Sequence, residues 1–151
     1  MGSIFRTADA AGVAKIYCCG ITPTPLDRFK EVRADFAKVS LGAERSVAWE
    51  YLKATAQAVE AARAEGCAIF AVEQSKKSVP YSKALKTTAR GGRDTRSKEK
   101  KICLIMGNEV DGVPPGILKL AERVLEIPMR GKKESLNVAV AFGIVAFGLL
   151  Q

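Results

Sequence analysis

Three short and almost continuous apolar runs constrain the fold of this chain most strongly. They are Cys67 to Val72, Ile102 to Met106 and Val124 to Ile127, and each is bounded by glycine, proline or polar residues. Runs of this kind are typical of strands that are buried on both faces of a parallel sheet. Helix-compatible segments separate them, so the sequence predicts an α/β fold with a mainly parallel sheet and helices on both faces.

Glycine stops and hydrophobic spacing predict the remaining elements. A further strand is expected over Val13 to Cys19. The predicted helices are Gly2 to Ala11, Leu26 to Val39, about Ser46 to Glu65, Ile117 to Arg123, and a final helix that begins at Ser135 or Asn137. Trp49 lies near the start of the third helix, where we interpret it as a packing residue rather than a base-stacking platform, because no second aromatic residue repeats beside it.

The length of 151 residues favours a single domain, residues 1–151. Its net charge of +8 is concentrated between Lys76 and Lys101, where ten Lys and Arg residues stand against Asp94 and Glu99. A basic loop of this kind predicts a surface that binds a polyanion such as nucleic acid. The alternative is a solvated loop with incidental charge.

Metal and membrane functions are disfavoured by composition. The chain has no histidine, and its four cysteines lack the spacing of metal ligands, so no metal is expected. Reduced cysteines favour a cytoplasmic location. The longest apolar run, Val138 to Leu150, is shorter than the roughly 18 residues of a membrane span and predicts a buried or interface helix.

The segment from Val124 to Val140 has the features of a small-molecule pocket. Its strand stops at Pro128, and a basic glycine turn, Arg130 to Lys133, follows. Ser135 or Asn137 then starts the final helix with a side-chain oxygen available to an N–H group or a ligand. A strand end, a glycine turn and a helix start form a common ligand site in α/β proteins.

Three motifs, in order and at their spacings, give the chain a specific resemblance to a known family. They are Gly2-Ser3-Ile4-Phe5-Arg6-Thr7-Ala8 through Gly12, Ile105-Met106-Gly107-Asn108-Glu109-Val110-Asp111-Gly112-Val113, and Ile127-Pro128-Met129-Arg130-Gly131 followed by Glu134-Ser135-Leu136-Asn137-Val138-Ala139-Val140-Ala141. The chain resembles, over nearly its whole length, the TrmH (SpoU) group of SPOUT RNA methyltransferases. Members of that group transfer a methyl group from S-adenosylmethionine to a ribose 2′-hydroxyl.

The resemblance implies a C-terminal trefoil knot, a rare exception to unknotted topology, with S-adenosylmethionine bound in it. Carried over by position, the cofactor-binding residues are Gly107, Ile127, Met129, Ser135 and Leu136. At Gly107 a missing side chain would let the adenosine lie against the backbone. Ile127 and Leu136 are equally compatible with a role as ordinary core residues.

The catalytic residues implied by the resemblance are Arg6, Glu109, Ser135 and Asn137. In the family, the residue matching Arg6 is assigned to activating the 2′-hydroxyl. A guanidinium does not readily give up its proton, so we expect Arg6 to bind the adjacent phosphate and stabilise the developing alkoxide. Ser135 and Asn137 could orient the hydroxyl or fix the loop, and Glu109 could instead cap the helix that follows.

The resemblance also implies RNA, either tRNA or rRNA, as the partner and a homodimer formed through the apolar final helix. The family has a strand and an Asn ahead of the position of Gly2, and this sequence starts without them. We therefore expect the first strand of the fold to be absent. A catalytically impaired RNA-binding protein that keeps the fold is the alternative to an active RNA 2′-O-ribose methyltransferase.

Overall fold

Parallel strand pairing organises the chain, as the apolar runs predict. The computed structural model describes residues 1–84, 101–108 and 110–150. The chain divides into two compact units, residues 1–58 and 59–151, and the boundary lies within a helix. The single domain expected from the chain length stays a prediction.

The first unit contains two parallel strands and a group of short helices. In chain order its elements are α1 (Gly2–Ala10), β1 (Lys15–Cys19), α2 (Ala34–Ser40), α3 (Ala43–Ser46), β2 (Ala48–Leu52) and the first part of α4 (Thr55–Ala64). Lys15 of β1 stands opposite Ala48 of β2. Helix α1 packs against α2 and α3, and the ring of Phe5 meets that of Phe36 edge to face at 5.1 Å.

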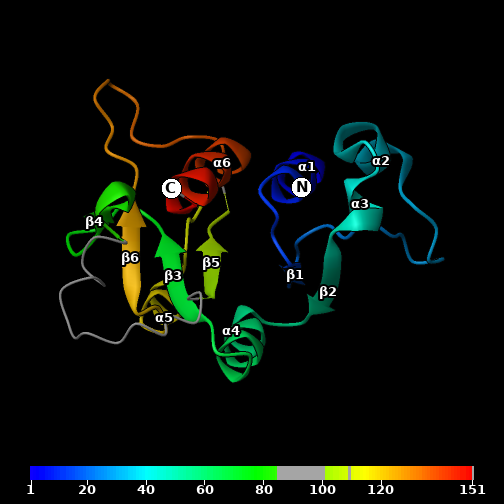
Figure 1. Cartoon of the computed structure of the whole chain (residues 1–151), viewed down its shortest axis with the longest axis horizontal. Coiled ribbons are helices and arrows are strands. Elements are labelled where there is room, and N and C mark those ends of the chain that lie inside the picture. The colour runs from blue at the N-terminus through cyan, green and yellow to red at the C-terminus, as the bar shows by residue number, and fades with distance from the viewer. Residues whose placement is uncertain (85–100, 109, 151) are drawn as a thin grey trace. The chain divides into compact units, whose positions relative to one another are not determined.

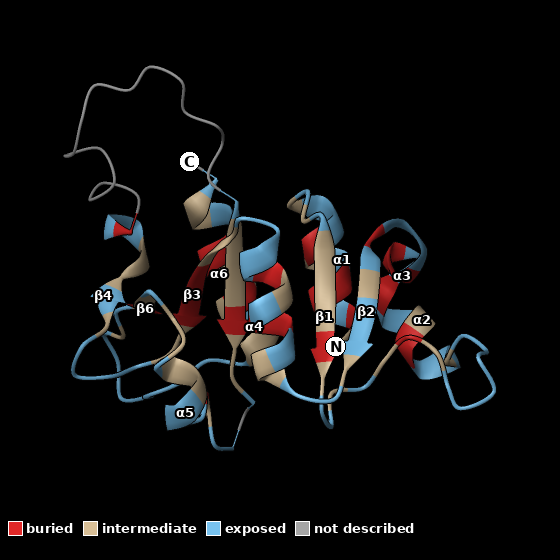
Figure 2. Cartoon of the chain, turned by 90° about the horizontal axis from the view of Figure 1, so that it is seen from below, coloured by how far each residue is buried: buried red, intermediate tan, exposed pale blue. Residues whose placement is uncertain are grey.

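The second unit is built on a four-stranded parallel sheet with the order β4-β6-β3-β5. Its elements are β3 (Ala68–Val72), β4 (Val79–Pro80), the 3₁₀ helix η1 (Tyr81–Lys83), β5 (Ile102–Met106), α5 (Pro115–Leu118), β6 (Arg123–Glu126) and α6 (Val138–Leu149). Strand β3 is buried along its middle, as Figure 2 shows in red. Helix α6, drawn in red in Figure 1, contacts β3 and η1, and a core cluster joins Phe70, Ala84, Leu125 and Val145.

The mainly parallel α/β architecture is therefore confirmed, and the three apolar runs form β3, β5 and β6. The helix predicted over Ile117 to Arg123 is wrong in its extent, because α5 ends at Leu118. Arg123 already belongs to β6, where it pairs with Phe70 of β3. Pairing with the central strand has overridden the helical pattern at this point.

The single helix predicted from Ser46 to Glu65 is also wrong. Its first third forms β2, and α4 begins only at Thr55. Val47, Trp49 and Tyr51 have high strand propensity, and the backbone of this segment is satisfied by pairing with β1. Figure 2 shows β2 largely exposed, so the alternation that usually reveals a half-buried strand is weak here.

The helix predicted from Leu26 to Val39 is wrong over its first half, because α2 begins at Ala34. The Asp27 carboxylate accepts the backbone N–H groups of Phe29 and Glu31 at 2.7 and 3.0 Å. A short side chain that captures nearby N–H groups in this way competes with helix formation. A bridge between Leu26 and Val32 closes the resulting turn.

No sequence pattern predicted β4, a two-residue strand that pairs with β6. It lies at the edge of the sheet, where Pro80 is tolerated because one side of an edge strand needs no N–H donor. In the part of the chain that the structure describes, no helix has the length and hydropathy needed to span a membrane.

Candidate functional site

The carboxyl ends of three neighbouring strands in the second unit carry most of the candidate site residues. Met106 of β5 and Leu125 of β6 both stand opposite Val72 of β3. Adjacent strands are about 4.8 Å apart, so the segments that leave β5 and β6 start roughly 10 Å from each other. Ligands of open α/β sheets bind at this edge, where chain segments diverge from neighbouring strands.

A tight turn, residues 107–113, follows β5. The backbones of Asn108 and Gly112 form an antiparallel bridge. The Asn108 side-chain oxygen accepts the N–H groups of Val110 and Asp111, each at 2.8 Å. The turn is therefore closed by its own hydrogen bonds and presents a defined backbone surface at the strand edge.

Glu73, the first residue after β3, holds this turn in place. Its carboxylate accepts the Val113 N–H at 2.8 Å through one oxygen and the Gln74 N–H at 2.9 Å through the other. Its own N–H donates to the Leu125 carbonyl of β6 at 2.9 Å. Glu73 is not among the site residues predicted from the sequence, although its position directly after a buried apolar run is a signal that could have identified it.

The fold of the turn requires a residue without a side chain at Gly107. A Cβ placed there would lie 2.7 Å from both the Gly112 Cα and the Val113 nitrogen, and backbone atoms cannot move aside cheaply. The reason for glycine at this position is thus the folding of the turn onto itself. The backbone of Gly107 remains half-exposed at the strand edge.

The loop from Ile127 to Asn137 leaves the tip of β6 and leads back to α6 (Figure 1). Ile127 packs against the core cluster of Phe70 and Leu125, as expected for a core residue. Leu136 is exposed and Met129 is half-exposed, so neither is an ordinary core residue in this chain.

The final helix starts at Asn137, which resolves the choice left open by the sequence. The Asn137 Oδ1 accepts the Ala139 N–H at 2.9 Å, and α6 runs from Val138. This cap fixes the side chain and orients its amide nitrogen as a donor. Ser135 lies exposed two residues earlier, beside the exposed basic residues Lys132 and Lys133.

The remaining catalytic candidates lie elsewhere. Arg6 is exposed on α1 in the first unit, between the buried residues Phe5 and Ala8. Glu109 lies outside the described residues, as does most of the predicted basic loop, residues 85–100. The second unit therefore carries Gly107 on the segment that leaves β5, and Ile127, Met129, Ser135, Leu136 and Asn137 on the segment that leaves β6 and leads to α6.

Comparison with known proteins gives consistent matches. The model of the SpoU rRNA methylase family matches residues 1–147. A tRNA (guanosine(18)-2′-O)-methyltransferase of Aquifex aeolicus (strain VF5) is 30% identical over 149 residues, which cover 96% of this chain and 60% of that protein. A 23S rRNA (guanosine-2′-O-)-methyltransferase of Escherichia coli (strain K12) is 29% identical, with coverage of 97% and 53%.

Solved structures agree with the sequence matches. The AdoMet-bound rRNA methyltransferase from Sinorhizobium meliloti superposes with a TM-score of 0.78 at 30% identity, over 97% of this chain and 49% of that one. A TrmH/SpoU tRNA-modifying enzyme from Aquifex aeolicus gives 0.75 at 28% identity, over 97% and 65%. The chain spans 50% to 60% of the length of the curated relatives that it matches.

Proposed function

The chain belongs to the SpoU rRNA methylase family, and from this premise we propose that it transfers the methyl group of S-adenosylmethionine to a ribose 2′-hydroxyl of tRNA or rRNA. The observation that carries the proposal is the arrangement at the sheet edge. The turn after β5 and the loop after β6 flank Glu73, and both carry the motif residues of the family.

The residues at this edge fit the chemistry of the cofactor. S-adenosylmethionine combines an adenine ring, which needs apolar faces and polar edges, with a charged amino-acid end. The half-exposed backbone of Gly107 offers hydrogen-bonding groups at the strand edge, and Met129 and Leu136 offer accessible apolar surface. When bound, the sulfonium supplies an activated methyl group. The residues that we propose hold the cofactor are Gly107, Ile127, Met129, Ser135 and Leu136.

Arg6 is the residue that we propose acts on the RNA. Its guanidinium offers several N–H donors in a planar fork, suited to a phosphate and to the negative charge that develops on the ribose oxygen. Ser135 and the amide of Asn137 are proposed to orient the hydroxyl, and the Glu109 carboxylate to accept the proton that the hydroxyl releases on attack. Holding the attacking oxygen in line with the methyl group is proposed to supply a further part of the rate acceleration.

We also propose that the chain works as a homodimer in the cytoplasm and that its C-terminal segment is knotted. The dimer is supported by α6, which is apolar around its whole circumference. Phe142 and Val145 are buried, whereas Val140 and Phe147 are 51% and 45% exposed. A second copy of the chain would cover these side chains.

The test of the proposed function is methyl transfer to unmodified bulk tRNA and rRNA. RNA is incubated with the chain and methyl-labelled S-adenosylmethionine and then digested to nucleosides. We expect the label in 2′-O-methylated nucleosides. Label on bases, or cofactor binding without any transfer to either RNA, would overturn the proposal.

A further inference from the structure

The first unit contains an open groove of about 830 Å³ between β2 and the turn that precedes α2. Its lining includes Arg28, Phe29, Lys30, Arg33, Trp49 and Tyr51. This volume is in the range of small-molecule sites, about 300–1,000 Å³. The groove lies wholly within residues 22–51, and none of the proposed catalytic residues line it.

The strand β2 gives the groove an aromatic wall. Trp49 and Tyr51 are two residues apart, a spacing that separates side chains on a helix but places them on one face of a strand. Their Cα atoms are about 6.6 Å apart. Tyr51 is 47% exposed and Phe29, from the turn, is 69% exposed. The expectation that Trp49 lacks an aromatic neighbour depended on the helix that the structure replaces with β2.

The charges around these rings favour the binding of an anion in the groove. The Arg28 guanidinium lies 4.7 Å from the centre of the Phe29 ring. Asp27 is the one carboxylate among the described residues that line the groove, and its Oδ1 is engaged by two backbone N–H groups. Glu50 alternates with Trp49 along β2 and pairs with Lys15 at 2.8 Å. Arg28 and Lys30 therefore dominate the charge of the groove.

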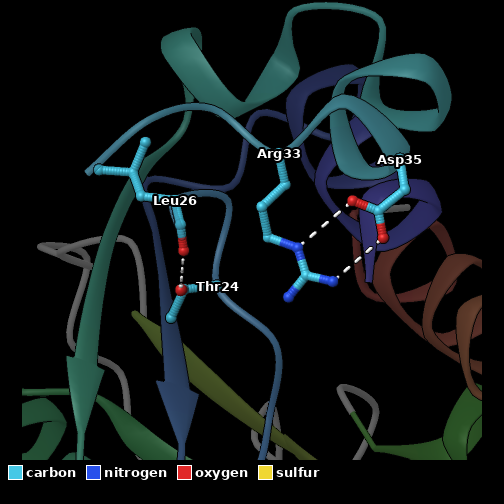
Figure 3. Close-up of polar contacts among 4 residues, drawn as sticks. All are labelled: Thr24, Leu26, Arg33 and Asp35. Atoms are coloured by element: carbon cyan, nitrogen blue, oxygen red, sulfur yellow. Dashed lines mark hydrogen bonds and ion pairs between the residues drawn. The ribbon is translucent and has the colours of Figure 1, made fainter. Parts of the chain in front are cut away.

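The turn is held in shape before any ligand arrives. Figure 3 shows the Thr24 hydroxyl donating to the Leu26 carbonyl at 2.7 Å and Arg33 donating through two nitrogens to Asp35 at 3.3 and 3.1 Å. The backbone N–H of Arg33 also donates to the Pro25 carbonyl at 3.0 Å. A preformed turn reduces the ordering cost of binding.

We propose that this groove binds an unpaired segment of the RNA substrate. Nucleobases stack on Tyr51 and Phe29 beside Trp49, and Arg28 and Lys30 contact the phosphates. Aromatic rings next to cations bind single strands in this way, whereas paired bases do not present their faces. The inference rests on the proposed function for the choice of RNA as the polyanion.

Trp49 is the only tryptophan in the chain, so its fluorescence reports on the groove without any substitution. The intact chain is titrated with an unstructured uridine-rich oligoribonucleotide of about ten nucleotides, a length within the site sizes of single-strand binders. We expect saturable quenching of Trp49 and at least tenfold weaker binding of a blunt RNA duplex. Unchanged emission, or equal binding of the duplex, would overturn the proposal.

Substitutions then locate the contacts. Phe29→Ala and Tyr51→Ala should each weaken binding of the labelled oligoribonucleotide about tenfold, whereas Tyr51→Phe, which keeps the ring, should retain it. Ile21 is 97% exposed and does not line the groove, so Ile21→Ala is the matched apolar control. Arg28→Ala removes one proposed phosphate contact. It should therefore reduce the slope of log affinity against log salt concentration by about one. An equal loss in Ile21→Ala, or no loss in Tyr51→Ala, contradicts the assignment.

The outcome separates this inference from the proposed function. Methyl transfer without quenching of Trp49 rejects the groove and leaves the activity standing. Quenching without methyl transfer rejects the activity and supports the groove. If Trp49 emission changes with protein concentration alone, and Phe29→Ala abolishes self-association in sedimentation, a second copy of the chain occupies the groove and the inference is wrong.

Discussion

The Glu73 carboxylate accepts the backbone N–H of Val113 at 2.8 Å and thereby connects the end of the central strand β3 to the turn that follows β5. The same residue donates its own N–H to Leu125 of β6. Glu73 is thus bonded to the turn after β5 and to strand β6, from which the loop of the proposed cofactor site departs. We infer that it positions the site rather than taking part in the reaction.

Replacing Glu73 tests this positioning role. Hydrogen bonds to charged groups contribute about 1.5–3 kcal/mol, so Glu73→Ala should release the turn and weaken binding of S-adenosylmethionine about tenfold or more. Glu73→Gln keeps one oxygen acceptor and should lose less. Calorimetric titration measures the affinities, with Glu60→Ala on α4 as the control for loss of an exposed carboxylate. Equal affinities in Glu73→Ala and Glu60→Ala would exclude the role.

A side chain at Gly107 should disrupt the turn. The added methyl group of Gly107→Ala meets the backbone at Gly112 and Val113, and overpacking of this kind costs about 1–3 kcal/mol. We expect a lower unfolding free energy in urea together with weaker cofactor binding. Gly116→Ala is the matched control, because its Cβ would meet nothing within 4 Å. Wild-type stability and affinity in Gly107→Ala would contradict the described turn.

Helix α6 packs closely on η1 at one point. A Cβ on Gly148 would lie 2.7 Å from the Tyr81 Cδ2 atom, so Gly148→Ala should destabilise the second unit by about 1–3 kcal/mol. The double variant Gly148→Ala/Tyr81→Leu removes the ring and should lose less stability than the two separate effects added together. Additive losses in urea denaturation would mean that these two residues do not meet.

Acid should weaken the fold through Glu44. The Ser40 hydroxyl donates to this buried carboxylate and lowers its pKa below the ordinary value of 4.5. Because the folded-state pKa is below that of the unfolded chain, the stabilisation is present above about pH 4.5 and is lost as the pH falls through the folded-state value. The stability difference between the wild type and Glu44→Gln should shrink between about pH 7 and about pH 3. A constant difference would argue against the shift.

The sequence predicted the sheet of the second unit well, because continuous apolar runs such as Cys67 to Val72 have few alternatives to a buried parallel strand. It failed at β2 and at the turn before α2. Val47 and Tyr51, four residues apart, fit a helical spacing by coincidence, and only pairing with β1 decides the conformation of this segment. The Asp27 side chain stops a helix through hydrogen bonds that spacing does not reveal.

The candidate site residues were predicted from the family motifs more than from the physical properties of the residues themselves. Motif spacing indicated Gly107, Ser135 and Asn137 as site residues, which stays a prediction, and Asn137 caps α6 in the structure. It did not indicate that Gly107 serves the turn itself, since that depends on a contact five residues along the chain. Nor did it indicate Glu73, whose partner Val113 lies forty residues away in sequence.

The central claim is that this chain methylates ribose and that Arg6 acts on the RNA rather than on the cofactor. The most direct measurement compares labelled methyl transfer to RNA by the wild type, Arg6→Lys and Arg6→Ala, alongside calorimetric binding of S-adenosylmethionine. We predict 2′-O-methylated nucleosides from the wild type, and from Arg6→Ala a rate lower by about a hundredfold or more with unchanged cofactor affinity. Arg6→Lys keeps the positive charge but lacks the planar set of N–H donors, so its rate should lie between those of the wild type and Arg6→Ala. Transfer by Arg6→Ala at the wild-type rate, or label on bases instead of ribose, would contradict the account.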